Sequence, residues 1–210
     1  MSAELKFLND VAKPWDELNA LLIKRYAFQP DLSSVTQKVS AIAAAIRHQI
    51  DIFAPHQSRN ERKKLESEIN AESDAVRLVT DVCDSIKHVR LTNLERENHL
   101  YVAAMFEVDT SEYFSFIRNG VFVEHATLGC KDFMQTSLDA IRYWVKKREL
   151  AIQWSGSINE ANVEFFSTAY LSFHPEYCIR MESLRIKCFQ RNDMGSLEAY
   201  SPSEVKLVIY

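Results

Sequence analysis

The sequence predicts an α+β protein, and three observations lead to that class. Through most of residues 1–95, apolar residues recur every three or four positions, which is the period of helices buried on one face. After residue 91 the period changes, and the run LYVAAMFEV is rich in the aromatic and branched side chains that strands favour. An Asn-Gly pair then separates two further strand-like runs. We therefore expect an N-terminal helical bundle, an inserted antiparallel hairpin or meander, and a C-terminal antiparallel sheet.

The composition favours one compact domain over residues 1–210. We expect a mainly helical sub-region at 1–95 and a mixed β sub-region with one long helix at 96–210. Of the 210 residues, 47% are hydrophobic, which is enough for a sizeable core, and only 4 Gly and 5 Pro are present to form a flexible linker. A formal charge of -4 argues against a surface that coats nucleic acid, although it permits a local basic patch. The N-terminus has no long apolar run, so we expect a cytoplasmic protein without membrane association.

Three helices are expected before residue 73. Pro14 suits the first turn of a helix, and the apolar residues after it predict a helix to about Phe28. A second helix should end at Pro55, and its run of alanines would allow another helix to approach closely. The run RNERKKLESEIN predicts a solvated, charged helix. The alternative for its cations is a patch that binds phosphate or a partner.

The strongest pattern lies in residues 73–91, SDAVRLVTDVCDSIKHVRL. At 100° per residue its apolar side chains fall in one arc, and an ionic ridge lines the opposite side. The members of this ridge are Arg77, Asp81, Asp84 and His88. Their spacing pairs Arg77 with Asp81 and Asp84 with His88, each one turn apart. A carboxylate one turn from an imidazole is a starting point for acid–base catalysis, so these four are candidate catalytic residues. The alternative is that the ridge only solvates the helix.

Strands are expected on both sides of one further helix. Asn119-Gly120 predicts the turn of a hairpin. A helix over 131–148 follows, and the dipole of that helix explains the basic cluster at its end. From residue 162 three strand-like runs follow, with a bulge near Glu182 and a connection through NDMGSLEAYSP.

Aromatic residues occupy both odd and even positions of these strands, so both faces of the sheet carry them. This pattern indicates that both faces are buried, between helices or between subunits. The alternative is an exposed platform on which bases stack, which needs neighbouring cations. Candidate binding cations on the next strand are Arg180, Arg185, Lys187 and Arg191.

Sequence motifs for metal or nucleophilic chemistry are missing. The four cysteines lack CxxC spacing, and the six histidines include no HExxH pair. No GxSxG elbow precedes a helix, and four isolated glycines form no phosphate loop. We expect no metal and no cofactor, and cysteines that are reduced and buried.

The segment DVCDSIKH contains a pattern of Asp or Asn followed by x-x-K-H, formed by Asp84, Lys87 and His88. Over residues 71–91 the chain resembles a set of uncharacterised small bacterial proteins. Some of these look like HEPN helical bundles, a group that includes metal-independent RNA-cleaving toxins. The resemblance implies that Asp84 and Lys87 belong to a site in which His88 is the acid–base residue.

The HEPN signature itself is an arginine and a histidine separated by four to six residues on a helix. In this chain only Arg118 and His125 have that spacing, and they flank the predicted Asn-Gly turn instead of lying on a helix. Two functions therefore remain. The first is a non-enzymatic interaction or accessory protein of bacterial or phage type, which self-associates or binds a protein partner through its apolar sheet or Ala-rich helix. The alternative is a HEPN-like ribonuclease, as a toxin or antiphage defence effector, that acts on RNA through His88 with Arg77, Asp81 or Asp84.

Overall fold

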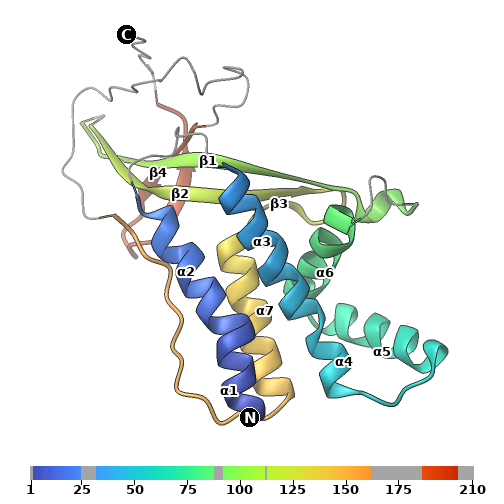
Figure 1. The fold of residues 1–210 in the computed structure, drawn as a ribbon. Coiled ribbons are helices and arrows are strands. Elements are labelled where there is room, and N and C mark those ends of the chain that lie inside the picture. Colours follow the sequence, from blue (N-terminus) through green and yellow to red (C-terminus); the bar gives the residue numbers. More distant parts are fainter. Residues whose placement is uncertain (1, 25–31, 88–91, 112, 162–185, 203–210) are drawn as a thin grey trace. The chain divides into compact units, whose positions relative to one another are not determined.

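A computed structural model describes residues 2–24, 32–87, 92–111, 113–161 and 186–202 (Figure 1). Contacts group the chain into two compact units. The first comprises Met1–Asn19, Ser34–Tyr101 and Val121–Ile158, and the second comprises Ala20–Ser33, Val102–Gly120 and Asn159–Tyr210. This grouping crosses the division between residues 95 and 96 that the sequence suggested. The α+β class is confirmed.

The first helical run begins earlier than predicted. It starts at Ala3, where Ser2 Oγ accepts the Leu5 N–H at 3.2 Å, and continues as α1 (Ala3–Phe7), η1 (Leu8–Ala12) and α2 (Lys13–Leu22). Pro14 therefore lies inside the run. Because proline has no N–H and its ring crowds the preceding turn, a wider π turn immediately before it accommodates the interruption. The predicted end at Phe28 lies outside the described residues.

The other predicted helices are confirmed. The second is divided into α3 (Leu32–Arg47) and α4 (Gln49–Phe53), and the charged run forms α5 (Arg59–Glu72). Next come α6 (Asp74–Lys87) and, later, α7 (Phe133–Lys147). Helix α6 packs against both α5 and α7. The core of the first unit contains the fully buried side chains of Phe7, Trp15, Ile42, Ile46, Ile69, Leu78, Phe133, Ile141 and Trp144.

Among the described residues, five strands form a sheet in the order β3-β2-β1-β4-β5, and β1 and β2 contribute residues to both units. The hairpin turn at Asn119-Gly120 is wrong, since β2 (Phe114–His125) runs straight through it. The chain instead reverses after β1 (Asn98–Val108), where Asp109 N–H donates to Tyr113 O at 3.0 Å and Asp109 Oδ1 accepts the Tyr113 N–H at 2.8 Å. Asn119 is buried, and its Nδ2 donates to Lys24 O at 3.1 Å. Burial therefore outweighed its local turn preference.

The second unit contains β4 (Ile186–Arg191) and β5 (Leu197–Tyr200), which pair antiparallel. Strand β5 lies in a stretch predicted to be a connection. Strand β4 pairs with β1 in parallel, so the sheet is mixed. Its apolar cluster contains Ala104, Phe106 and Phe116, with Phe114, Ala161, Ile186 and Cys188 packed against it. The strands predicted over 162–185 and 203–210, and the bulge near Glu182, lie outside the described residues.

The cysteines differ in environment. Cys83 is buried as expected and Cys188 is half-buried, but Cys130 is exposed on β3 (Gly129–Asp132), where burial was predicted. Cys178 lies outside the described residues. None of the described helices is both long and apolar enough to cross a membrane.

Candidate functional site

Helix α6 forms as predicted but is covered on more sides than its pattern suggested. Ser73 caps it by accepting the Val76 N–H at 3.3 Å, and the helix is described to Lys87. Seven consecutive residues, Leu78–Asp84, are buried. A solvated ridge, which was the alternative to a catalytic one, is therefore wrong at Asp81, which is 1% exposed, and at Asp84, which is 9% exposed. His88 lies outside the described residues.

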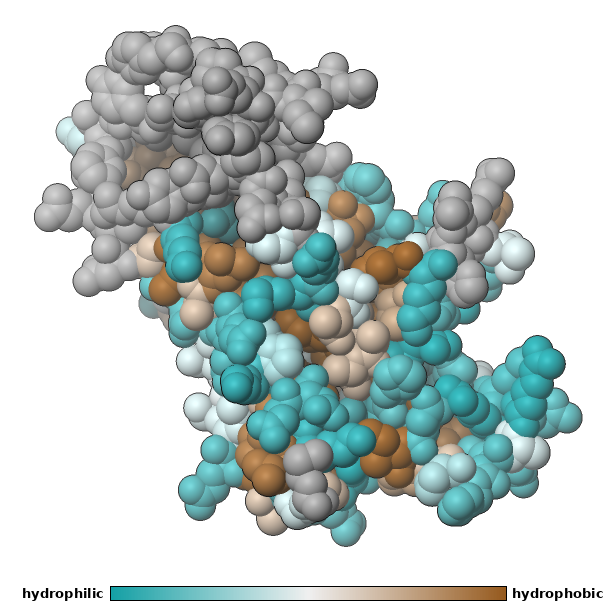
Figure 2. All heavy atoms as spheres, in the orientation of Figure 1, coloured by the Kyte–Doolittle hydropathy of each residue, from teal (hydrophilic) through white to brown (hydrophobic). Residues whose placement is uncertain are grey.

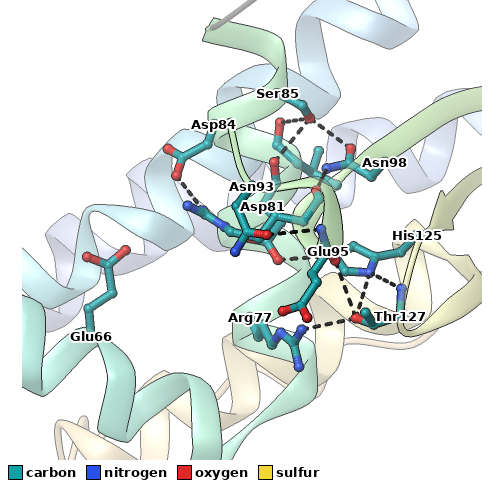
Figure 3. Close-up of polar contacts among 12 residues, drawn as sticks. Glu66, Arg77, Asp81, Asp84, Ser85, Asn93, Glu95, Asn98, His125 and Thr127 are labelled. Carbon is teal, nitrogen blue, oxygen red and sulfur yellow. Dashed lines mark hydrogen bonds and ion pairs between the residues drawn. The ribbon is translucent and has the colours of Figure 1, made fainter. Parts of the chain in front are cut away.

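Asp81 is at the centre of a buried ionic network (Figure 3). Its Oδ1 accepts a hydrogen bond from Arg96 Nε at 2.5 Å, and its Oδ2 lies 3.1 Å from His125 Nε2. Arg96 ends the short helix η2 (Leu94–Arg96), and His125 ends β2. Asp81 was predicted to pair with Arg77, so the partner of this carboxylate is corrected. A buried charge needs such partners, because water cannot solvate it.

Arg96 bridges the two aspartates of α6. Its Nη2 donates to Asp84 Oδ2 at 2.6 Å, while its Nε donates to Asp81 Oδ1. Burial disfavours the charge of Arg96, but the hydrogen bonds to Asp81 and Asp84 outweigh this and raise its pKa. Arg47 Nε of α3 lies 3.2 Å from Asp84 Oδ1 without the alignment of a hydrogen bond, and Arg47 Nη2 lies 3.7 Å from Glu66 of α5. The network therefore joins three helices and η2.

The hydrogen bonds of His125 define its tautomer. Its Nδ1 accepts from the backbone N–H groups of Thr127 and Leu128 at 3.2 and 3.3 Å. Because backbone N–H groups only donate, the ring proton belongs on Nε2, which then donates to Asp81. The His125 side chain is 0% exposed. It ties the turn between β2 and β3 to α6, and no substrate in solvent can reach it.

Arg77 lies at the edge of the same network. Its Nη2 donates to Thr127 Oγ1 at 3.0 Å, and that hydroxyl lies 3.5 Å from Glu95 O. About two turns further along α6, Ser85 Oγ donates to Asn98 Oδ1 at 2.7 Å. These contacts attach the segment around η2 to α6 at both ends of the network. The term clamp network is used below for Asp81, Asp84, Arg96, His125, Arg47 and Arg77 with these contacts.

The remaining predicted binding residues that the structure describes belong to different units. Lys87 is exposed at the end of α6 in the first unit, whereas Lys187 is half-buried on β4 in the second. Arg180 and Arg185 lie outside the described residues. Arg118 and His125 are both buried on β2, seven positions apart, so strand alternation places their side chains on opposite faces. They therefore do not form the helical arginine and histidine pair of HEPN proteins.

Sequence reasoning missed Arg96 and the role of His125. Both come from segments distant in sequence from α6. Arg96 stands in no motif, and His125 was noted only for its spacing from Arg118. The one available signal was the spacing of Asp81 and Asp84, which lets a single guanidinium bridge both carboxylates. Within the described ranges, no group of three His, Cys, Asp or Glu residues is placed to hold a metal ion.

Comparison with known proteins finds no relative of this chain. No protein-family model, no curated protein and no solved structure matches the chain.

Proposed function

We propose that this chain is a non-enzymatic interaction or accessory protein, of bacterial or phage type, that self-associates. The observation that carries this proposal is the closure of the clamp network. The side chains of Asp81 and His125 are 1% and 0% exposed, and each has its partners within the fold. Groups that are held in this way stabilise a structure, whereas an acid–base residue must reach its substrate.

The clamp network holds elements that expose apolar side chains. Leu94 of η2 is 64% exposed and Ile86 of α6 is 41% exposed. Because Arg96 fixes η2 to α6 through both aspartates, Leu94 is presented on an anchored element. Anchored apolar side chains are typical of the centre of an interface, where they bind with little loss of conformational freedom. The Ala-rich part of α3 offers less apolar area, because Ala43 is buried and the side chains of Ala41, Ala44 and Ala45 are small.

Light scattering coupled to size exclusion tests self-association. We expect twice the 24.3 kDa mass of one chain at micromolar concentration. The double variant Ile86→Glu with Leu94→Glu should return the mass to that of one chain. The matched control is Met194→Glu, because Met194 is 87% exposed and lies in the other unit. A wild-type monomer without a co-purifying protein would contradict the proposal.

An RNA-cleavage assay on the same preparation tests the ribonuclease alternative. Cleavage of RNA by the wild-type protein that disappears in His88→Ala, with the melting temperature unchanged, would replace the present proposal by that alternative. If His88→Ala lowers the melting temperature as well as abolishing cleavage, His88 supports the fold instead of acting on RNA.

A further inference from the structure

Residues 151–158 lie on the helices of the first unit as an extended segment, which we call the strap. They follow the end of α7 and belong to no helix or strand. Figure 1 shows the strap running beside α2, and hydrogen bonds attach it to both α2 and α7. Figure 2, in the same orientation, shows hydrophilic and hydrophobic residues interspersed over the helices. The strap and the side chains that hold it all belong to the first unit.

The side chains of the strap alternate between the helices and solvent. The inward ones are buried or half-buried, and they are Ile152, Trp154, Gly156 and Ile158. The residues between them are exposed. An alternation of two is the pattern of an extended chain that lies on a surface. Residues 150–159 include no charged side chain, although 26% of the chain is charged, so the strap has the character of an uncharged, extended peptide.

The strap is held by side chains of the two helices beneath it, as a bound peptide is held. Asn19 Nδ2 of α2 donates to Ser157 O at 2.7 Å, and Arg142 Nη2 of α7 donates to Gly156 O at 3.1 Å. In the described structure, residues 153–158 make no backbone–backbone hydrogen bond. Secondary structure therefore does not fix this segment, and its position depends on recognition by α2 and α7.

Trp154 and Gly156 make the closest contacts of the strap. The Trp154 ring meets the fully buried Trp15 edge-on, with ring centroids 5.5 Å apart, and its Nε1 donates to Asp16 Oδ2 at 3.0 Å. A Cβ on Gly156 would lie 2.7 Å from Leu138 of α7, so glycine allows the backbone to approach this closely. Tryptophan is among the residues that dominate the binding energy of interfaces. This face therefore accepts an aromatic anchor followed two residues later by glycine.

We propose that the face formed by α2 and α7 binds an extended peptide of a partner protein, and that the strap is an intramolecular ligand that occupies this site. The partner segment is an uncharged peptide with Trp and, two residues later, Gly. A tethered ligand competes at an effective concentration of about 1 mM, so a site with an intrinsic Kd of about 10 µM would be closed about 100-fold. A second copy would first have to release its own strap, so a segment without such a tether is the favoured occupant.

Fluorescence anisotropy with a labelled peptide of residues 150–159 tests the site in the full chain. Trp154→Ala removes the anchor of the strap, so the peptide should bind this variant at least tenfold more tightly than it binds wild type. The matched control is Gln153→Ala, which changes an exposed strap residue and should alter peptide affinity less than twofold. A peptide that itself carries Trp154→Ala should not bind.

A second variant opens the site without removing the anchor. Gly156→Ala crowds Leu138, so it should also give the peptide access to the site. In either open variant, Arg142→Ala should weaken peptide binding about fivefold, because one hydrogen bond is lost. Ile86→Glu with Leu94→Glu should leave peptide binding unchanged, so this result is independent of self-association.

Several outcomes would overturn the proposal. One is that neither open variant binds the peptide at about 1 mM, the effective concentration of the strap. Another is equal binding of a scrambled peptide. Global unfolding of both open variants would show that the strap is an integral part of the fold and not a displaceable ligand. If Gly156→Ala forms new dimers that the peptide dissociates, the occupant is the strap of a second copy, and the partner proposed here is wrong.

Discussion

The substitution Asp81→Asn tests whether the clamp network supports the fold. It keeps the size of the side chain and removes the charge that Arg96 and His125 share. The amide can accept from one of these donors, but its own N–H groups then face the other, so one buried donor loses its acceptor. Breaking a buried ion pair costs about 3–5 kcal/mol. Because the Arg96 side chain is 33% exposed and keeps Asp84, we place the cost at the lower end, about 3 kcal/mol.

Urea unfolding followed by circular dichroism measures this cost. The midpoint should fall with little change in the slope, and the melting temperature should drop by about 6–12 °C for a chain of this length. The matched control is Asp139→Asn, since Asp139 is 48% exposed and lies 3.8 Å from Arg142, a surface pair worth at most about 1 kcal/mol. A double-mutant cycle with Arg96→Gln should give a coupling energy of about 1–3 kcal/mol. If Asp81→Asn costs no more than Asp139→Asn, the argument that this network is structural is refuted.

Two further predictions concern the first unit. Gly156 has φ +46°, and a Cβ there would lie 2.6 Å from Trp154, so Gly156→Ala should cost about 2–3 kcal/mol in thermal unfolding. At Gly129, with φ +70° and open space, the same change should cost only about 1 kcal/mol, and equal costs would contradict the packing argument. A hydrogen bond from Lys147 lowers the pKa of Glu72 in the folded protein. The ionised Glu72 carboxylate therefore stabilises the fold at pH values above the pKa that Glu72 has in the unfolded chain. This stabilisation disappears as the pH falls through the lower pKa of the folded protein. Unfolding curves of wild type and Glu72→Gln should therefore differ at pH 7 and converge in acid, and a constant difference would refute this assignment.

Local signals in the sequence predicted much of the fold. Helical periodicity identified α3, α5, α6 and α7, because an amphipathic pattern reflects burial of one face wherever the helix lies. The Asn119-Gly120 signal failed because these residues lie within a long buried strand, where ladder hydrogen bonds and packing outweigh a turn preference. The chain turned instead at Asp109, whose side chain supplies the hydrogen bonds of the turn.

The candidate site likewise has a part that follows from the sequence and a part that only the tertiary structure determines. The spacing of Asp81 and Asp84 along one helix follows from the sequence alone. Their environment does not, because Arg96 and His125 reach them through tertiary contacts across 15 and 44 positions of the chain. A helical pattern shows which side chains lie together on one face, but it does not show whether water or another segment covers that face. In this protein η2 and the end of β2 cover it, and only the tertiary structure made the ionic face of α6 a buried one.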